Sequence, residues 1–551
     1  MSLLAVTDVR LSRDKGFSWS KSRNVSVKGY LFDAHDVYYE EDALLNFFDR
    51  ADSVAEFRAT LLKANGCFAV VKKIGDHVCA GVDRVRSIPL FFGTSADGLL
   101  LSDEARPVRD ALSDNTLDPV SEQAFLHSGY TLEQDTLHPR VKQLGAGEIL
   151  IWNQVDRSLT ATPYFRHLHQ DFVERSADDL EEELDELTKG FARRLLASAR
   201  GKTIVIPLSG GYDSRLILCA LKREGYQDAI CYTYGREGSF EARVANAVAR
   251  QLGYRHYQVC YDRTTWQTLL DSHRFVEYCQ FVANECAVPH FQDLPALQEL
   301  NEKRLIPHDA LVVPGFCGDL LGGSYVPIEL SLGKGDLLLA EGIDEYLLRQ
   351  HFYLHGNRIE PRHADVLKAK IRAGTAASSI ENISDFVSLS EDWFTRHKVA
   401  KFVVNALRVY EWLGYAWRMP LWDSRLIEWW YRIPVHHRTE STLYHRYLFK
   451  RLFLPMRVGF TKGVTKRKFE TVLCRYLPRS LVNAIVRAFL TYRPLTAKAN
   501  VNAFSDLKEL LLERLLDHPN SRKDAHLNGL IALWWLLPQN QLRTSVERDG
   551  T

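Results

Sequence analysis

Six consecutive residues, Ser209-Gly210-Gly211-Tyr212-Asp213-Ser214, carry the clearest chemical signal in the sequence. They follow an apolar run at residues 203–208 and precede a segment with helical periodicity. Adjacent glycines let backbone N–H groups turn toward one point, and the start of a helix adds partial positive charge there. Ser209 and Ser214 add hydroxyl donors, so the segment predicts a cradle for phosphate or pyrophosphate. Asp213 would repel a bare phosphate, which favours a Mg²⁺ ion between this carboxylate and the phosphates.

An ordinary turn with Asp213 capping the helix is the alternative interpretation of these residues. A chance match to this pattern in a chain of this length has a probability of about one in a thousand, which favours the functional interpretation. The segment is neither a Walker A loop nor a G-x-G-x-x-G fingerprint. Kinase-type transfer and dinucleotide binding are therefore disfavoured.

A second glycine-rich segment, residues 313–325 (VPGFCGDLLGGSY), also follows a predicted strand. Taken alone, its Gly318-Asp319 pair would most simply be a turn. Considered together with the first segment, Asp319 can also be interpreted as a metal ligand. Two carboxylates at two strand ends, Asp213 and Asp319, would offer a hard cation oxygen ligands opposite the phosphates.

The first segment resembles the PP-loop of the ATP pyrophosphatases, and the second resembles the G-x-G-x-D-x-x-x-G-G loop of the asparagine synthetase family. The resemblance implies an enzyme that cleaves ATP to AMP and pyrophosphate while adenylating a carboxylate. It further implies that Asp213 and Asp319 hold Mg²⁺. The residues that it implies for ATP binding are Ser209, Gly210, Gly211, Asp213, Ser214, Tyr232, Thr233 and Gly318.

Two later stretches extend this resemblance. Residues 418–426 (RMPLWDSRL) match the family's R-x-P-[FL]-x-D-x-x-L element, although an Arg418–Asp423 pair that braces helices is an equal alternative. Residues 444–450 resemble its T-K-Y-L-L-R stretch, with Arg446 at the lysine position and Lys450 at the arginine position. The resemblance implies catalytic roles for both. A guanidinium can stabilise an anionic transition state, but it does not readily carry a proton.

The elements that must position these residues fall into two patterns. Residues 1–165 hold short strand-like runs separated by Gly, Asp and Ser, with few helices expected, and the region resembles the family's glutaminase-type domain. Strand–helix alternation follows from residue 203, and helical periodicity dominates beyond about residue 335. We therefore expect a mixed α/β and α+β protein. Its expected parts are a glutaminase-like (Ntn-type) antiparallel β-sandwich at 1–170, a doubly wound PP-loop α/β domain at 171–475 and a helical extension at 476–551.

The N-terminal part departs from the family at its catalytic positions. The family's nucleophile is a cysteine exposed after methionine removal, whereas this sequence begins Met1-Ser2. The N-G-E element falls on Lys28-Gly29-Tyr30, and the R-G-P-D loop has no counterpart. Ser2 could become a nucleophile in place of cysteine, but the missing oxyanion donor and substrate clamp disfavour this. We expect a glutaminase fold without glutaminase chemistry.

Composition restricts the remaining possibilities. The chain has 551 residues, with 70 Lys+Arg against 69 Asp+Glu, so no basic excess suggests a nucleic-acid partner. Its nine cysteines form no C-x-x-C pair, and no signal peptide or membrane span is expected. We expect a cytoplasmic ligase that uses ATP, Mg²⁺, a small-molecule carboxylate and ammonia or an amine, and a homodimer is left open. A nucleotide-sensing scaffold and a tRNA-modifying PP-loop enzyme are the alternatives.

Overall fold

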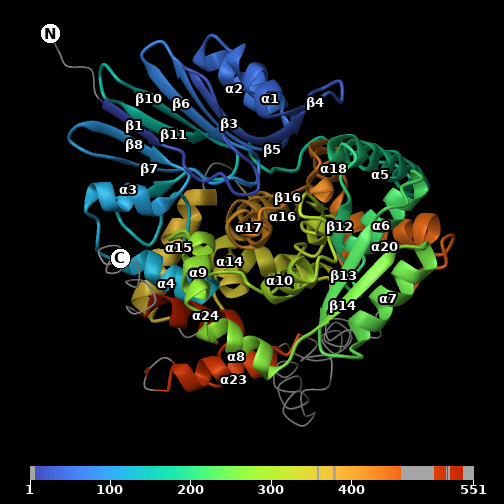
Figure 1. Cartoon of the computed structure of the whole chain (residues 1–551). Helices are drawn as coiled ribbons and strands as arrows, with labels where there is room; N and C mark the ends of the chain where they lie inside the picture. Colours follow the sequence, from blue (N-terminus) through green and yellow to red (C-terminus); the bar gives the residue numbers. More distant parts are fainter. Residues whose placement is uncertain are drawn as a thin grey trace.

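A computed structural model describes residues 6–356, 359–375, 380–460, 502–516, 518 and 521–537. Two β-sheets form its N-terminal part, at the upper left of Figure 1. One has the strand order β1-β8-β7-β9, and the other has the order β11-β10-β6-β5-β3-β2 with β4 paired to β3. The strands are β1 (Val6–Arg10), β2 (Ser20–Lys21), β3 (Val25–Phe32), β4 (Tyr38–Glu40), β5 (Asn65–Ile74), β6 (His77–Val82), β7 (Phe91–Thr94), β8 (Gly98–Ser102), β9 (Lys142–Gln143), β10 (Glu148–Asn153) and β11 (Leu159–Pro163).

Strand β5 shows how this layered part is built. Successive side chains of a strand point to opposite faces of the sheet. Phe68 and Val70 pack in the cluster beneath helices α1 (Glu41–Asp49) and α2 (Val54–Lys63), whereas Cys67 and Ala69 face the main core. The strand is therefore buried on both sides, as its nearly continuous apolar sequence predicts.

The antiparallel expectation is confirmed with one exception, because β1 pairs with β8 in parallel while the other strand pairs of these two sheets are antiparallel. Helices are also more frequent here than the sequence indicated. Helices α3 (Ala105–Leu112) and α4 (Pro119–Ser128) join α1 and α2. Both are short, at eight and ten residues, which leaves few turns in which helical periodicity can show.

A five-stranded, fully parallel sheet with the order β14-β13-β12-β15-β16 lies at the centre of the second part. Its topology confirms the predicted doubly wound α/β arrangement, in which the strand order reverses beside the first strand, β12. The sheet and its first helices comprise α5 (Ala177–Ala199), β12 (Ile204–Pro207), α6 (Asp213–Arg223), β13 (Ile230–Gly235), α7 (Phe240–Leu252), β14 (Arg255–Cys260), β15 (Leu311–Val312) and β16 (Ala416–Trp417).

Most of the chain after β14 is helical, as its periodicity predicts. The helices are α8 (Arg263–Asp271), α9 (His273–Ala283), α10 (Leu294–Glu302), α11 (Gly318–Leu321), α12 (Ile328–Ser331), α13 (Gly335–Glu341), α14 (Ile343–His351), α15 (Pro361–Thr375), α16 (Ile383–Phe394), α17 (Arg408–Trp412), α18 (Ser424–Trp430), α19 (Val435–Arg438) and α20 (Thr442–Tyr447). Tighter or wider helical segments are η1 (Thr395–Val403), η2 (Val404–Leu407), η3 (Pro420–Trp422), η4 (Thr439–Ser441) and η5 (Leu448–Phe453).

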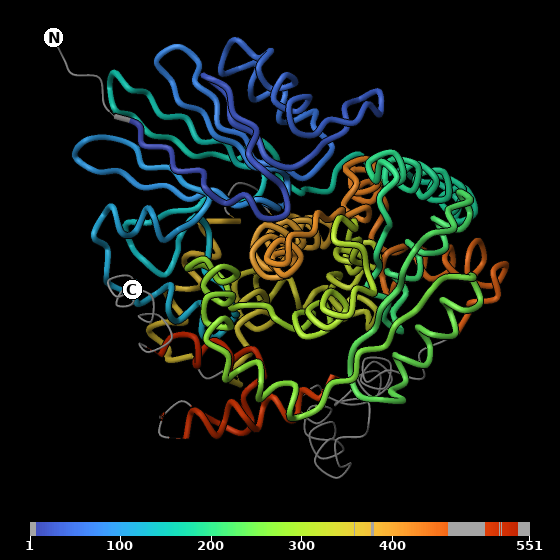
Figure 2. The backbone as a smooth tube through the Cα atoms, viewed as in Figure 1, coloured from blue at the N-terminus to red at the C-terminus, as the bar shows by residue number. Residues whose placement is uncertain are grey.

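Two C-terminal helices, α23 (Phe504–Arg514) and α24 (Leu527–Leu536), pack back onto the body of the protein. In Figure 2 the red C-terminal helices lie beside much earlier segments, and α23 contacts α8 while α24 contacts α4. Trp534 stacks on Phe275 with ring centroids 5.7 Å apart. Cys474 and much of the predicted 476–551 extension lie outside the described residues.

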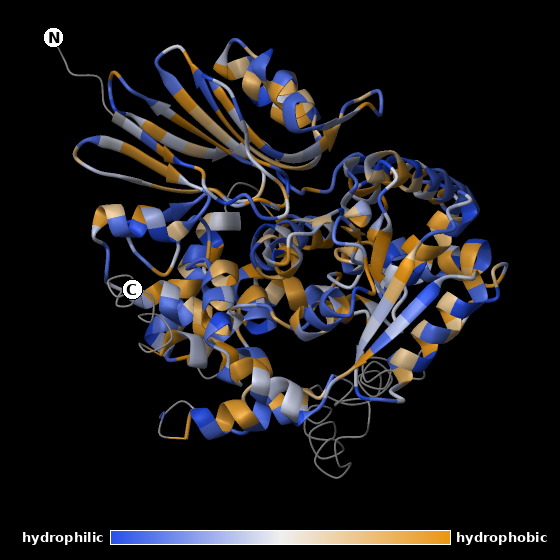
Figure 3. Cartoon of the chain, viewed as in Figure 1, coloured by the Kyte–Doolittle hydropathy of each residue, from blue (hydrophilic) through white to orange (hydrophobic). Residues whose placement is uncertain are grey.

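In Figure 3 apolar and polar residues alternate along the helices, and apolar residues are frequent in the strands of both parts. The main apolar core takes buried residues from both parts. The described part of the chain contains no helix with the length and apolarity that a membrane crossing requires. Residues 164–176, between β11 and α5, form neither helix nor strand and connect the two parts.

Candidate active site

The first glycine-rich segment connects the end of β12 to the start of α6, as predicted. Its hydroxyls shape the turn, because Gly211 N donates to Ser209 Oγ over 3.0 Å and Ser209 N donates to Ser214 Oγ over 3.3 Å. A side chain at Gly210 would lie 3.2 Å from the Glu241 Cα atom, so the loop packs closely on the start of α7. The exposed Ser209 and the half-buried Asp213 are at the mouth of this turn. We refer to residues 209–214 as the first loop.

The second glycine-rich segment, residues 313–325, packs directly on the first loop, and we refer to it as the second loop. A Cβ atom at Gly315 would lie 2.7 Å from Ser214 N, and one at Gly318 would lie 2.2 Å from Asp213 Cγ. Real Cβ atoms essentially never approach so closely, so glycine is required at both positions if Asp213 is to keep its place. The tertiary structure therefore brings together the two segments that the sequence singled out.

Asp213 begins helix α6 and Asp319 is the second residue of α11, on neighbouring sides of this contact. Asp319 is exposed, and its carboxylate is accessible to a ligand. Among the described residues, no three His, Cys, Asp or Glu side chains gather closely enough to hold a metal alone. Two carboxylates beside an anion cradle nevertheless fit Mg²⁺, which keeps water and phosphate oxygens among its ligands. These two residues would hold the ion.

Tyr444, on helix α20, contacts the Asp213 carboxylate directly. Its hydroxyl donates a hydrogen bond to Asp213 Oδ1 over 2.8 Å. Burial, reinforced by the Asp213 charge, raises the pKa of Tyr444 well above its usual value, so the hydroxyl remains a donor. The ring of Tyr212 packs against His445 and Phe449 on the same side. Helix α20 and η5 therefore cover the first loop.

The two predicted catalytic residues point elsewhere. Arg446 Nη2 donates to Asp178 Oδ1 over 2.7 Å, and Arg446 Nε forms an ion pair with Glu181. Lys450 pairs with the same two carboxylates, because its Nζ lies 2.7 Å from Asp178 Oδ1 and 3.1 Å from Glu181 Oε2. Residues two apart in a helix lie on nearly opposite faces, so Arg446 and Tyr444 cannot both face the first loop. Arg446 and Lys450 join α20 and η5 to α5, and a catalytic role for them stays a prediction.

Tyr232 and Thr233, which the resemblance implied for ATP binding, lie in β13 and have their polar side-chain atoms engaged. The Tyr232 hydroxyl donates to the buried Asp293 carboxylate over 3.2 Å. Thr233 Oγ1 donates to Leu208 O over 2.5 Å and lies 2.9 Å from His256 Nε2. Any contact of Tyr232 with a nucleotide would therefore use its backbone, because its buried side chain points into the core.

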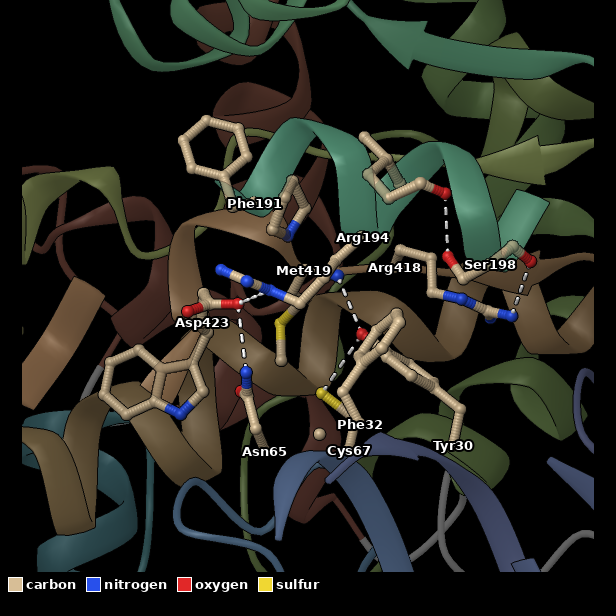
Figure 4. A pocket seen from close by; sticks show the side chains of 14 residues that line it. Tyr30, Phe32, Asn65, Cys67, Phe191, Arg194, Ser198, Arg418, Met419 and Asp423 are labelled. Carbon is tan, nitrogen blue, oxygen red and sulfur yellow. Dashed lines mark hydrogen bonds and ion pairs between the residues drawn. The ribbon is translucent and has the colours of Figure 1, made fainter. Parts of the chain in front are cut away.

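The third family-like stretch lies at the contact between the N-terminal sheets and α5, around a cavity of about 30 Å³ (Figure 4). Asp423 accepts hydrogen bonds from Arg194 Nε over 2.7 Å and from Asn65 Nδ2 over 3.1 Å. Arg418 donates instead to Trp417 O over 2.9 Å and to Ser198 O over 3.3 Å. Arg418 and Asp423 thus hold different partners rather than each other, which corrects the idea of one bracing pair.

The Lys28-Gly29-Tyr30 element of the N-terminal part is buried. Lys28 is buried and its ammonium donates to the Arg13 carbonyl. Burial lowers the pKa of Lys28 to about 8. Gly29 has a φ of +100°, and a Cβ atom there would lie 2.1 Å from Cys67 O. Met1 and Ser2 lie outside the described residues.

Sequence reasoning missed the contacts that depend on facing side chains. Tyr444 is the first residue of the family-like stretch at residues 444–450, but nothing in its spacing predicted that it would contact Asp213. Tyr325 ends the second segment, and its ring stacks on Phe394 with centroids 3.7 Å apart. Phe394 is 69 residues later in a helical region, so only the folded chain shows this wall beside Asp319.

A family model described as asparagine synthase matches residues 184–531, whereas no curated protein matches the chain. The NH3-dependent NAD synthetase of Campylobacter jejuni is 13% identical, with the match covering 38% of this chain and 99% of that one at a TM-score of 0.21. The U34-tRNA thiolase NcsA of Methanococcus maripaludis is 14% identical, with coverage of 42% and 80% and a TM-score of 0.20. The glutamine phosphoribosylpyrophosphate amidotransferase of B. subtilis is 12% identical, with coverage of 44% and 63% and a TM-score of 0.17. The match thus spans less than two thirds of this amidotransferase, and superpositions this loose carry no argument about function.

Proposed function

Because the chain belongs to the asparagine synthase family of ATP-dependent amide-forming ligases, we propose that it adenylates a small-molecule carboxylate and transfers ammonia or an amine to it. The products would be an amide, AMP and pyrophosphate. The observation that carries this proposal is the packing of Gly318 against Asp213, which places the second carboxylate, Asp319, beside the first loop. A phosphate cradle with a pair of carboxylates at its mouth suits a nucleotide with its metal ion.

The chemistry follows from the weakness of a carboxylate as an electrophile. A carboxylate oxygen of the substrate attacks the α-phosphorus of ATP, which forms an acyl-adenylate and releases pyrophosphate. The nitrogen lone pair of ammonia or an amine then attacks the activated carbonyl, AMP leaves, and the nitrogen loses a proton. Mg²⁺ bound by Asp213 and Asp319 would neutralise charge on the phosphates. The backbone N–H groups of the first loop and the start of α6 would bind the phosphate oxygens.

For the nitrogen donor we propose free ammonia or an amine, including one within the substrate itself. Lys28 replaces the expected oxyanion donor, and its ammonium is engaged with a backbone carbonyl. Glutamine hydrolysis by this chain would release glutamate. Glutamate release by the full-length protein, abolished by Ser2→Ala, would overturn this part of the proposal.

A nucleotide-sensing scaffold is the second candidate. The ion pairs of Arg446 and Lys450 with Asp178 and Glu181 favour it, because they draw two expected catalytic cations away from the first loop. A tRNA-modifying PP-loop enzyme has no comparable support, given the even charge balance of 70 basic to 69 acidic residues. We propose that the ligands are small molecules and that the protein acts in the cytoplasm without a nucleic-acid or membrane partner. A homodimer is left open.

Carboxylate-dependent ATP–pyrophosphate exchange tests the proposal. The full chain is assayed with a panel of amino, sugar and peptide acids, alongside Asp213→Asn and Asp319→Asn. At least one acid should support exchange, and either variant should reduce it by on the order of 100-fold or more, because each removes a ligand charge beside the phosphates. Amide and AMP should form when ammonium or an amine is added. Tight ATP binding with no exchange for any acid would favour the sensor.

A further inference from the structure

Lys398, in η1, lies beside the second loop through a chain of ring contacts. Tyr325 follows Asp319 by six residues, and its ring stacks on Phe394 with centroids 3.7 Å apart and an interplanar angle of 26°. The ammonium of Lys398 lies 5.0 Å from the centre of the same Phe394 ring. His351 contacts the Phe394 ring edge-on at 4.8 Å. Lys398 therefore belongs to the aromatic wall next to Asp319.

The Lys398 ammonium is half-buried, and no carboxylate of the described residues lies within ion-pairing distance of it. Burial lowers the pKa of Lys398, and the Asp319 carboxylate is the charge that opposes this effect. Two histidines, His351 and His526, also face it. Burial lowers the pKa of both, so neither adds a second positive charge near the ammonium at neutral pH. The Asp319 carboxylate is therefore a source of negative potential for this lysine.

Occupation of Asp319 would change that balance. Under the proposed function, Asp319 is a ligand of Mg²⁺, so its charge would be shared with a divalent cation. A half-buried ammonium beside a metal ion is unfavourable unless an anion compensates it, because partial burial removes much of its hydration. An oxyanion placed between Lys398 and Asp319 would be attracted both to the Lys398 ammonium and to the Mg²⁺ ion held by Asp319.

We propose that Lys398 forms an oxyanion subsite beside Asp319, which takes either a carboxylate of the acid substrate or a phosphate oxygen of the nucleotide. This inference rests on the proposed function and deepens it. The rings of Tyr325 and Phe394 form the apolar wall of the subsite, and they hold the lysine stem in place. The acid or the nucleotide would thus contact three elements, namely the first loop, the second loop and η1.

The test compares Lys398→Met and Lys398→Arg with the wild type. Calorimetry measures the binding of Mg·ATP and Mg·pyrophosphate, and exchange assays measure the KM of any acid that supports exchange. Loss of one charge-assisted contact should weaken the affected ligand by roughly 10- to 100-fold, and arginine should restore most of it. Weaker Mg·ATP and Mg·pyrophosphate binding identifies the nucleotide as the source of the oxyanion. A raised KM for the acid with unchanged nucleotide binding identifies the substrate carboxylate.

Lys508→Met is the matched control. Lys508 is also half-buried and also acts on His526, but its counter-charge is Asp524 rather than Asp319. It should leave every affinity within twofold of the wild type. The same result for Lys398→Met would overturn the subsite while leaving the proposed function intact. Failure of the wild type itself to bind Mg·ATP would instead overturn the proposed function, and the subsite with it.

Discussion

The hydroxyl of Tyr444 donates a hydrogen bond to Asp213 Oδ1 over 2.8 Å, across 231 residues of sequence. This contact links helix α20 to the first residue of α6. The hydrogen bond holds one oxygen of Asp213, a carboxylate that we propose as a ligand of Mg²⁺. The orientation of that carboxylate therefore depends on the position of α20. Tyr444 is therefore a positioning residue in the proposed site.

Tyr444→Phe should preserve the fold and weaken the use of Mg²⁺. The variant keeps the buried ring but removes a hydrogen bond to a charged group, which is worth about 1.5–3 kcal/mol. The Mg²⁺ concentration that half-saturates exchange should rise by roughly 10-fold or more, with kcat at saturating Mg²⁺ less affected. Tyr447→Phe is the control, because its hydroxyl donates to Asp185 instead, over 3.1 Å. An unchanged Mg²⁺ dependence in Tyr444→Phe would remove its positioning role.

Gly318→Ala should abolish exchange without unfolding the protein. The added Cβ atom would lie 2.2 Å from Asp213 Cγ and displace that carboxylate. Gly322→Ala tests the same loop without the clash, since its nearest neighbour would be Gly318 O at 3.4 Å. We expect a loss on the order of 100-fold for the first variant and less than threefold for the second. Equal activities, measured beside circular dichroism spectra, would contradict the close approach.

Arg446 should act through the position of helix α20. Its ion pair joins an exposed guanidinium to Glu181, whose side chain is fully buried, so we expect Arg446→Met to lower the free energy of unfolding by roughly 1–2 kcal/mol. Glu181→Gln should give a similar loss, and the double variant should lose less than the sum. Denaturant unfolding of the four proteins measures this coupling. A fall in kcat with Arg446→Met that Glu181→Gln does not share would instead support direct catalysis.

The free energy of unfolding should fall below pH 6.5 because of His167. This histidine connects the two parts of the protein, with Nε2 2.8 Å from Arg84 O and Nδ1 2.9 Å from the Tyr431 hydroxyl. Burial lowers the pKa of His167 to about 4, against opposing effects of the Asp392 charge and the Arg84 carbonyl. Between pH 6.5 and 4 the unfolded chain therefore binds more protons than the folded one, so acid favours unfolding.

His167→Gln should remove this component. We expect the wild type to lose roughly 2–3 kcal/mol more than the variant between pH 6.5 and 4.5, as urea unfolding at each pH would measure. His308→Gln, at an exposed histidine, serves as the control and should follow the wild type. Parallel curves for wild type and His167→Gln would show that this histidine does not govern the acid response.

Sequence alone determined the local parts of the site. The apolar run before Ser209 became β12, and the segment with helical periodicity that follows Ser214 became α6. Strand and helix formation depend mainly on neighbouring residues, through backbone hydrogen bonding and the spacing of apolar side chains. The glycines of both loops could be recognised for the same reason, since each permits a turn that other residues resist.

Only the tertiary structure decided which side chains meet. The stretch at residues 444–450 pointed to Arg446 and Lys450, yet the packing of α20 turns Tyr444 toward Asp213 and pairs the two cations with α5. Arg418 and Asp423 likewise hold separate partners on α5. The face that a helix presents depends on how it packs against elements hundreds of residues away, and local sequence does not encode that rotation. The chemistry of the first loop was therefore predictable, whereas the residues that orient it were not.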